Sequence, residues 1–313
     1  MAPAIFVSAS GNETHIHPPY LIIMQHSIPV QQAPDTALYP SRSRFVQLAA
    51  GNMHYVDEGA GEVILFVHGT PAWSFLYRRH IAALSKKYRC IAIDHLGFGL
   101  SEKPTDFPGT PQAHAHNLSE FIQKLALKNM IWEVNDFGAP IGLVCAIEHA
   151  RRSKRMVLFN TWLWETQSNP AAQKVDKIIR SALGRFLYLN LNFSPRVLLK
   201  QGFSDKKKLS KKLHRQYLLP FPRKSTRHSL LRLAQSLTGS SNWYQEQREK
   251  LGALDKKPWL ILWGMKDKFL TPDYLEKWTS RLPGAAVHTW DCGHFVQEEC
   301  PAESIGAIEA FMR

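Results

Sequence analysis

Two carboxylates and one histidine could do chemistry together in this sequence. Asp136 stands in the run VNDFG, Asp267 in WGMKD and His294 in DCGHF, and each run follows a short apolar segment. In this order the first carboxylate would attack a substrate, and the histidine, oriented by the second carboxylate, would activate a water. Taken singly, each residue has an ordinary explanation as a helix cap, a turn former or a half-buried histidine. Their shared position after apolar runs favours a catalytic triad.

A fourth polar run, HGTP at 68–71, also follows an apolar segment. We expect the backbone N–H groups of Thr70 and Phe137 to point at one spot, where they would form an oxyanion hole. A tight turn without chemistry is the alternative. The run LGFGLS at 96–101 lacks the third glycine of a dinucleotide-binding loop, so we expect no cofactor there.

The elements that must position these residues are short buried strands. Six apolar runs end in polar or glycine-rich turns, as the strands of a parallel sheet do: 63–68, 90–94, 130–134, 156–160, 259–263 and 286–290. Helical periodicity at 73–86 and 141–150 alternates with them and predicts an α/β protein. Nucleophile, acid and base in this order, with the first on a strand-to-helix turn, indicate an α/β-hydrolase fold. No G-x-S-x-G run occurs, so the nucleophile would be a carboxylate.

The alternation of strands and helices stops between about 161 and 248, where Leu, Phe, Tyr and Lys recur at helical spacing. We therefore predict a core of residues 41–160 and 236–313 and an inserted helical cap of residues 161–235. Residues 1–40 are predicted to be a poorly packed extension. This extension lacks the basic region of a secretory signal, and Met24 is a candidate start.

The net charge of +13 is concentrated in one segment. Residues 151–250 hold 22 Lys+Arg and 5 Asp+Glu, a balance of +17. Apolar residues interleave these charges at helical spacing, which favours the solvated face of a helical cap, and neither stacking modules nor a P-loop suggests a nucleic-acid partner. No apolar run is long enough to span a membrane. The four cysteines lack zinc spacing and are too few for a disulfide framework, so we expect a cytoplasmic protein without a metal site.

With these motifs in place, the sequence resembles the haloalkane dehalogenases, in the branch whose catalytic acid follows the strand after the cap. The resemblance runs from about Phe45 to the C-terminus. It rests on HGTPAWSFLYR (68–78), DHLGFGLSEKP (94–104), NDFGAPIGL (135–143), NTWLW (160–164), YLLPFP (217–222), TGSSNWY (238–244), WGMKDKFLTP (263–272) and CGHFVQEE (292–299). It implies an α/β-hydrolase fold with a mostly parallel eight-stranded sheet and an inserted helical cap.

The resemblance also implies a reaction that needs no cofactor. Asp136 would displace halide from a small hydrophobic substrate to leave an alkyl ester, and water activated by the His294–Asp267 pair would hydrolyse that ester. The residues expected to line the substrate pocket are Trp162, Trp164, Tyr217, Pro220 and Trp243. Nothing in the sequence indicates an oligomeric state.

Two positions depart from the family's pattern. The family usually has Trp after the nucleophile and, in many members, Asn after His-Gly, and both grip the departing halide, whereas this chain has Phe137 and Thr70. Trp162, Trp164 and Trp243 are candidate replacement donors. An epoxide hydrolase with a proton donor among Tyr188, Tyr217 and Tyr244 remains open, as do an esterase and, less favoured, a ligand-binding protein without catalysis.

Overall fold

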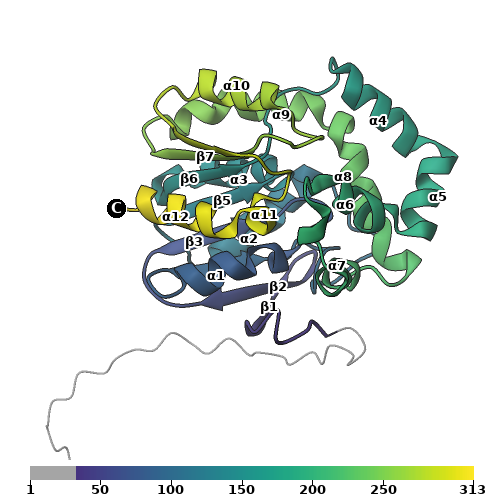
Figure 1. Cartoon of the computed structure of the whole chain (residues 1–313), viewed down its shortest axis with the longest axis horizontal. Coiled ribbons are helices and arrows are strands. Elements are labelled where there is room, and N and C mark those ends of the chain that lie inside the picture. The colour runs from purple at the N-terminus through teal and green to yellow at the C-terminus, as the bar shows by residue number, and fades with distance from the viewer. Residues whose placement is uncertain (1–32) are drawn as a thin grey trace, which may run out of the picture.

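A twisted sheet of eight strands forms the centre of the molecule (Figure 1). The structure is a computed structural model and describes residues 33–313. The strand order is β1-β2-β4-β3-β5-β6-β7-β8, and all pairs are parallel except β1–β2 and β2–β4. The strands are β1 (Ser43–Leu48), β2 (Gly51–Glu58), β3 (Val63–Val67), β4 (Arg89–Ile93), β5 (Met130–Asn135), β6 (Ser153–Phe159), β7 (Trp259–Gly264) and β8 (Ala286–Trp290). The predicted mostly parallel, eight-stranded α/β-hydrolase sheet is confirmed.

Helices cover both faces of the sheet, which is why its central strands are apolar throughout. On β5, Met130 and Trp132 enter one core and Ile131 enters the other. The helices are α1 (Arg78–Leu84), α2 (Pro111–Lys124), α3 (Gly138–Glu148), α4 (Pro170–Arg180), α5 (Ala182–Leu191), α6 (Leu199–Gly202), α7 (Lys211–Leu218), α8 (His228–Gly239), α9 (Ser241–Glu249), α10 (Pro272–Arg281), α11 (Val296–Glu299) and α12 (Pro301–Phe311). Helices α1, α11 and α12 pack together, as do α2, α3 and α9.

The strand predicted at 286–290 differs from the expectation of a buried strand. Its residues are mostly exposed because β8 lies at the edge of the sheet and pairs only with β7. Polar side chains such as His288 and Thr289 are compatible with such an edge.

Helices replace strands in the segment that joins β6 to β7, and α4, α5, α7 and α8 lie together beyond one end of the sheet (Figure 1). Helix α4 begins after Asn169 and α5 after Ser181, whose side chains accept hydrogen bonds from N–H groups of the first turns. Residue 235, the predicted end of the cap, lies inside α8. The division into a core (41–160 and 236–313) and a cap (161–235) stays a prediction.

The predicted N-terminal extension falls mostly outside the described residues, which begin at 33. In the described part, residues 33–40, one side chain is buried. Tyr39 is buried, its ring packs edge-on against Trp73, and its hydroxyl lies 2.6 Å from Ser74 Oγ. An aromatic side chain with a satisfied hydroxyl is a stable anchor for this segment.

Candidate active site

Asp136 lies at the sharp turn between β5 and α3. Its backbone has a φ of +54°, a left-handed conformation that is uncommon for residues other than glycine. Two neighbouring glycines permit this turn. A Cβ atom on Gly69 would lie 2.2 Å from Asp136 Oδ1, and one on Gly138 would lie 2.0 Å from the carbonyl oxygen of Val67. The predicted strand–turn–helix around VNDFG is therefore present, with the carboxylate projecting from it.

The two oxygens of the Asp136 carboxylate have different surroundings. Oδ1 accepts a hydrogen bond of 2.9 Å from the backbone N–H of Thr70, and the N–H of Phe137 lies close enough to this carboxylate to affect its pKa. Oδ2 lies 3.7 Å from His294 Nε2. Burial raises the pKa of Asp136, while the positive charge available on His294 and the two N–H groups act in the opposite direction. The predicted oxyanion-hole N–H groups thus converge on the Asp136 carboxylate.

His294 and Asp267 form a close, buried pair. His294 Nδ1 lies 2.7 Å from Asp267 Oδ2 and donates the proton, since an ionised carboxylate can only accept. This tautomer leaves a lone pair on Nε2, the nitrogen that faces Asp136. Burial alone would lower the pKa of His294, but the charge of Asp267, the hydrogen bond to it and the charge of Asp136 together raise it above its ordinary value.

Asn160 supports this pair and was not singled out in the sequence, where it appears only at the start of NTWLW. Its side-chain Nδ2 donates to Asp267 Oδ2 at 2.9 Å, and its Oδ1 accepts from the Gly264 N–H at 2.8 Å. Its carbonyl oxygen accepts from the N–H of Asp136 at 3.1 Å. Asn160 therefore links the ends of β5, β6 and β7. Its position directly after a strand is the signal that could have identified it.

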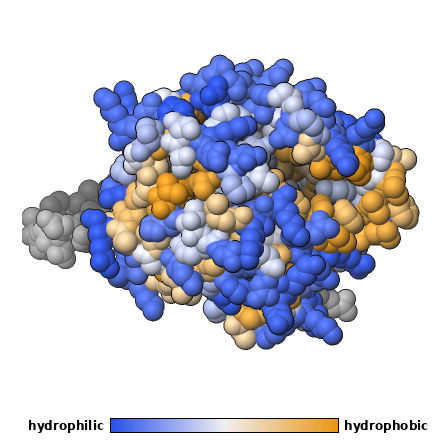
Figure 2. Space-filling view, turned by 45° about the horizontal axis from the view of Figure 1, so that its top comes forward, coloured by the Kyte–Doolittle hydropathy of each residue, from blue (hydrophilic) through white to orange (hydrophobic). Residues whose placement is uncertain are grey.

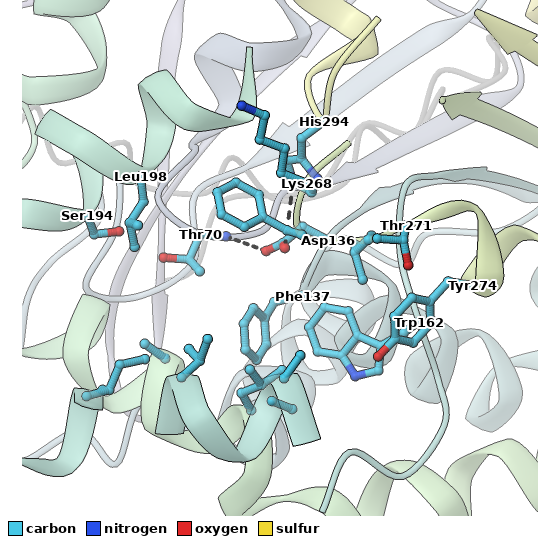
Figure 3. Close-up of a pocket in the computed structure, with 18 of the residues that line it drawn as sticks. Thr70, Asp136, Phe137, Trp162, Ser194, Leu198, Lys268, Thr271, Tyr274 and His294 are labelled. Atoms are coloured by element: carbon cyan, nitrogen blue, oxygen red, sulfur yellow. Dashed lines mark hydrogen bonds and ion pairs between the residues drawn. The ribbon is translucent and has the colours of Figure 1, made fainter. Parts of the chain in front are cut away.

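A cavity of about 480 Å³ opens above Asp136, within the size range of small-molecule sites. Figure 3 shows Asp136, Phe137 and Trp162 on its wall, with dashed lines from Asp136 to Thr70 and His294. Its other walls come from α4 and α5, the segment around Ser194 and Leu198, α8 and the loop from Lys268 to Thr271. Most of this lining is apolar, as a hydrophobic substrate would require.

Of the residues expected to line the pocket, Trp162 does so. The other four do not line this cavity. Trp164 packs edge-on against Trp278, and Trp243 packs against Tyr244. Tyr217 is fully buried and donates from its hydroxyl to Glu298 at 2.5 Å, and Pro220 is buried close to it in the chain. Tyr217 and Pro220 are buried and Trp164 and Trp243 are partly buried, all four outside the lining of this cavity.

The two positions that usually bind the halide in this family, 70 and 137, offer few hydrogen-bond donors in this chain. Phe137 is 5% exposed, lines the cavity and packs edge-on against Trp162, with ring centres 4.8 Å apart. Thr70 Oγ1 is buried without a hydrogen-bond partner among the described residues, and Figure 3 shows it directed toward Ser194. Trp162 Nε1 likewise lacks a described partner, but Figure 3 places it on the side of its ring away from Asp136. Thr70 therefore offers the better-placed donor.

Only one of the three candidate tyrosines lines the cavity. Tyr188 does so, and its pKa is raised by burial and by the charge of Asp136. The hydroxyl of Tyr217 is engaged by Glu298, and that of Tyr244 donates to the Ser236 carbonyl at 2.7 Å.

The family model for the α/β hydrolase fold matches residues 62–301. Haloalkane dehalogenase 2 of Mycobacterium tuberculosis is 34% identical over 278 residues, which cover 88% of this chain and 96% of the relative. The chain is a haloalkane dehalogenase-like α/β-hydrolase. The cis-3-alkyl-4-alkyloxetan-2-one decarboxylase of Shewanella oneidensis is another relative of this hydrolase, 32% identical over 88% of this chain and 89% of its own.

Solved structures agree with this assignment of the hydrolase. A mutant of the haloalkane dehalogenase DatA from Agrobacterium tumefaciens C58 has a TM-score of 0.79 and 25% identity, covering 90% of this chain and 100% of that one. Within residues 33–313, no helix of the hydrolase combines the length and apolarity needed to cross a bilayer.

Proposed function

We propose that this hydrolase converts small hydrophobic haloalkanes and water into alcohols and halide, with Asp136 as the nucleophile. The observation that carries the proposal is the orientation of the Asp136 carboxylate. Oδ1 is held by the Thr70 N–H, while Oδ2 faces the cavity and the His294–Asp267 pair. A carboxylate held in this way can attack through Oδ2 while Oδ1 stays in the oxyanion hole.

The reaction would run in two steps. Oδ2 attacks the carbon that bears the halogen, the carbon–halogen bond breaks, and halide leaves behind an alkyl ester of Asp136. His294 Nε2 then takes a proton from a water that attacks the ester carbonyl, and charge develops on Oδ1 beside the Thr70 and Phe137 N–H groups. Collapse of this intermediate breaks the bond to the alkoxide, which receives the proton as the alcohol leaves.

The proposed chemistry requires no cofactor or metal. The four free cysteines support a cytoplasmic setting.

A second candidate function is the opening of strained cyclic substrates. Phe137 offers no donor to a departing halide, but a ring oxygen stays attached to the substrate and needs no halide site. Tyr188 in the cavity could protonate an epoxide oxygen, and attack on an oxetan-2-one would yield a ring-opened carboxylate. Loss of CO2 from that carboxylate would form an alkene and return Asp136 to its free form. The oxetan-2-one decarboxylase among the relatives favours including this class.

The test is a panel of bromoalkanes, epoxides, short esters and cis-dialkyl oxetan-2-ones. Release of bromide with alcohol supports the dehalogenase, whereas diol from epoxides or alkene with CO2 from oxetan-2-ones supports ring opening. Acid from esters alone would contradict both.

The halide donors give a prediction for the dehalogenase. The double variant Phe137→Trp with Thr70→Asn should raise bromoalkane turnover by about tenfold or more, because a hydrogen bond to a charged group contributes roughly 1.5–3 kcal/mol. The gain should be larger for chloroalkanes, whose poorer leaving group depends more on stabilisation of developing charge. Halide release under identical conditions measures it.

Thr70→Val is the matched control, because it removes the hydroxyl at nearly equal volume and should lower halide release. A double variant that folds with an unchanged thermal midpoint and gains nothing would contradict the halide-site argument. The midpoint matters because a larger indole could overpack against Trp162.

The raised pKa of His294 gives a second prediction. Ester hydrolysis requires the neutral imidazole, so its rate should fall as the pH drops through the pKa of His294. In the alkyl ester, Asp136 no longer carries the charge that helps to raise this pKa. The acid limb of hydrolysis should therefore lie below the pKa of His294 in the free enzyme. Single-turnover rates against pH, compared with an NMR titration of His294, measure both values. A hydrolysis rate independent of pH across this range would contradict a histidine base.

A further inference from the structure

Helices α4 and α5 expose an apolar patch at the end of the molecule farthest from the C-terminus. The patch consists of Val175, Ile178, Leu183, Phe186 and Leu191, whose side chains are between 45% and 62% exposed. Figure 2 shows apolar side chains gathered at this end, over the region where Figure 1 places α4 and α5. The two helices pack against each other, so the five residues form one surface.

Folding does not account for this patch. On α4, Ala172 and Ile179 are buried, whereas Val175 and Ile178, three residues apart on the adjoining part of the helix surface, are 45% and 51% exposed. An apolar side chain that stays in water contributes nothing to the hydrophobic stabilisation of the fold. Contiguous exposed apolar residues of this kind mark an interaction surface.

The charges around the patch identify the kind of partner. Lys174, Lys177, Arg180 and Arg185 lie on α4 and α5, and the only acidic residue of these helices, Asp176, is paired with Arg180. A second copy of the chain would bring like charges together on this surface. An anionic lipid surface instead offers negative charge for the Lys and Arg side chains and an apolar interior for the apolar side chains of the patch.

The patch continues into the mouth of the cavity. Val175 is both exposed and part of the cavity lining, and so is Phe269, which is 43% exposed on the loop after β7. Lys268 stands beside Phe269, and Figure 3 shows its side chain extending away from Asp136. A surface bound to α4 and α5 would therefore lie next to the entrance through which an apolar substrate reaches Asp136.

We propose that the α4–α5 patch docks on anionic lipid bilayers and turns the mouth of the cavity toward the lipid. The apolar side chains enter the boundary between headgroups and acyl chains, and the surrounding Lys and Arg side chains contact the phosphates. Docking of this kind would let a lipophilic substrate pass from the bilayer into the cavity, a consequence that rests on the proposed function. Binding to the bilayer itself does not depend on that function.

The experiment is flotation of the full chain, without substrate, with vesicles of pure phosphatidylcholine or of equal parts phosphatidylcholine and phosphatidylglycerol. We expect binding to the anionic vesicles and little to the neutral ones. Each positive charge removed by Lys174→Gln or Lys177→Gln should weaken binding about fivefold. Raising the salt concentration should weaken it further by screening.

The matched pair of variants is Leu183→Glu and Val287→Glu. Both replace an exposed aliphatic residue by a carboxylate, but Val287 lies on the edge strand β8 outside the patch. Leu183→Glu should weaken binding about tenfold or more, and Val287→Glu should not. Since both positions are exposed, neither substitution should lower the midpoint temperature of thermal unfolding.

Three results would overturn the proposal: no binding to anionic vesicles, equal weakening by both variants, or self-association in the absence of vesicles that Leu183→Glu abolishes. The last would assign the patch to a second copy of the chain. Sedimentation velocity over a range of protein concentrations detects it. Because no substrate is present, loss of docking and failure of the proposed activity are separate outcomes.

Discussion

Asp136→Asn should abolish turnover, with a loss of more than about 10⁴-fold on any substrate that the wild type consumes. An amide in this position keeps the shape of the carboxylate but cannot attack carbon and form the ester. Product release and the mass of the Asp136 peptide measure the effect, and no alkyl adduct should appear.

The same variant should retain its fold. Because burial raises the pKa of Asp136, the ionised carboxylate is disfavoured in the folded chain, and a neutral amide should leave the thermal midpoint unchanged or higher at neutral pH. Normal turnover by folded Asp136→Asn would remove Asp136 from the mechanism. Asp136→Ala also lacks a nucleophile and should be equally inactive. It is the control that separates loss of the carboxylate from an effect of the introduced amide.

His294→Gln should show the second large effect, a single turnover followed by arrest. Attack by Asp136 does not use the imidazole as a base, whereas hydrolysis of the ester does. We expect a burst of halide that approaches one equivalent per enzyme and an alkyl adduct on the Asp136 peptide. Rapid quench followed by peptide mass spectrometry measures both.

The matched control is His288→Gln, because His288 is an exposed histidine on β8, outside the cavity. That variant should keep the wild-type rate and show no accumulated adduct. If folded His294→Gln gives neither a burst nor an adduct with a substrate of the wild type, the two-step mechanism is wrong.

Local patterns predicted the central strands and the turns that follow them. The runs at 63–68, 130–134 and 259–263 are apolar at nearly every position because helices cover both faces of these strands, so their burial is visible residue by residue. The antiparallel pair β1–β2 was not recognised as strands. These strands include the polar residues Arg44, His54 and Asp57 among their apolar ones, and β2 completes its pairing with β4, which lies more than 30 residues further along the chain.

The sequence by itself determined which chemical groups stand at the ends of the strands: Asp136, Asp267 and His294, with Thr70 and Phe137 beside them. It could do so because the carboxyl ends of parallel strands share one edge, so that position along the chain translates directly into proximity. Their distances, and the bridge that Asn160 makes to Asp267, required the tertiary structure.

The tertiary structure alone also decided which side chains line the cavity. Trp164, Tyr217, Pro220 and Trp243 are large or apolar residues in the segment between β6 and β7, as Trp162 is, yet only Trp162 of these lines the cavity. The direction of a side chain in this segment depends on how its helices and connecting loops pack against their neighbours. That packing is set by many weak contacts between segments far apart in the chain, and no local pattern records it.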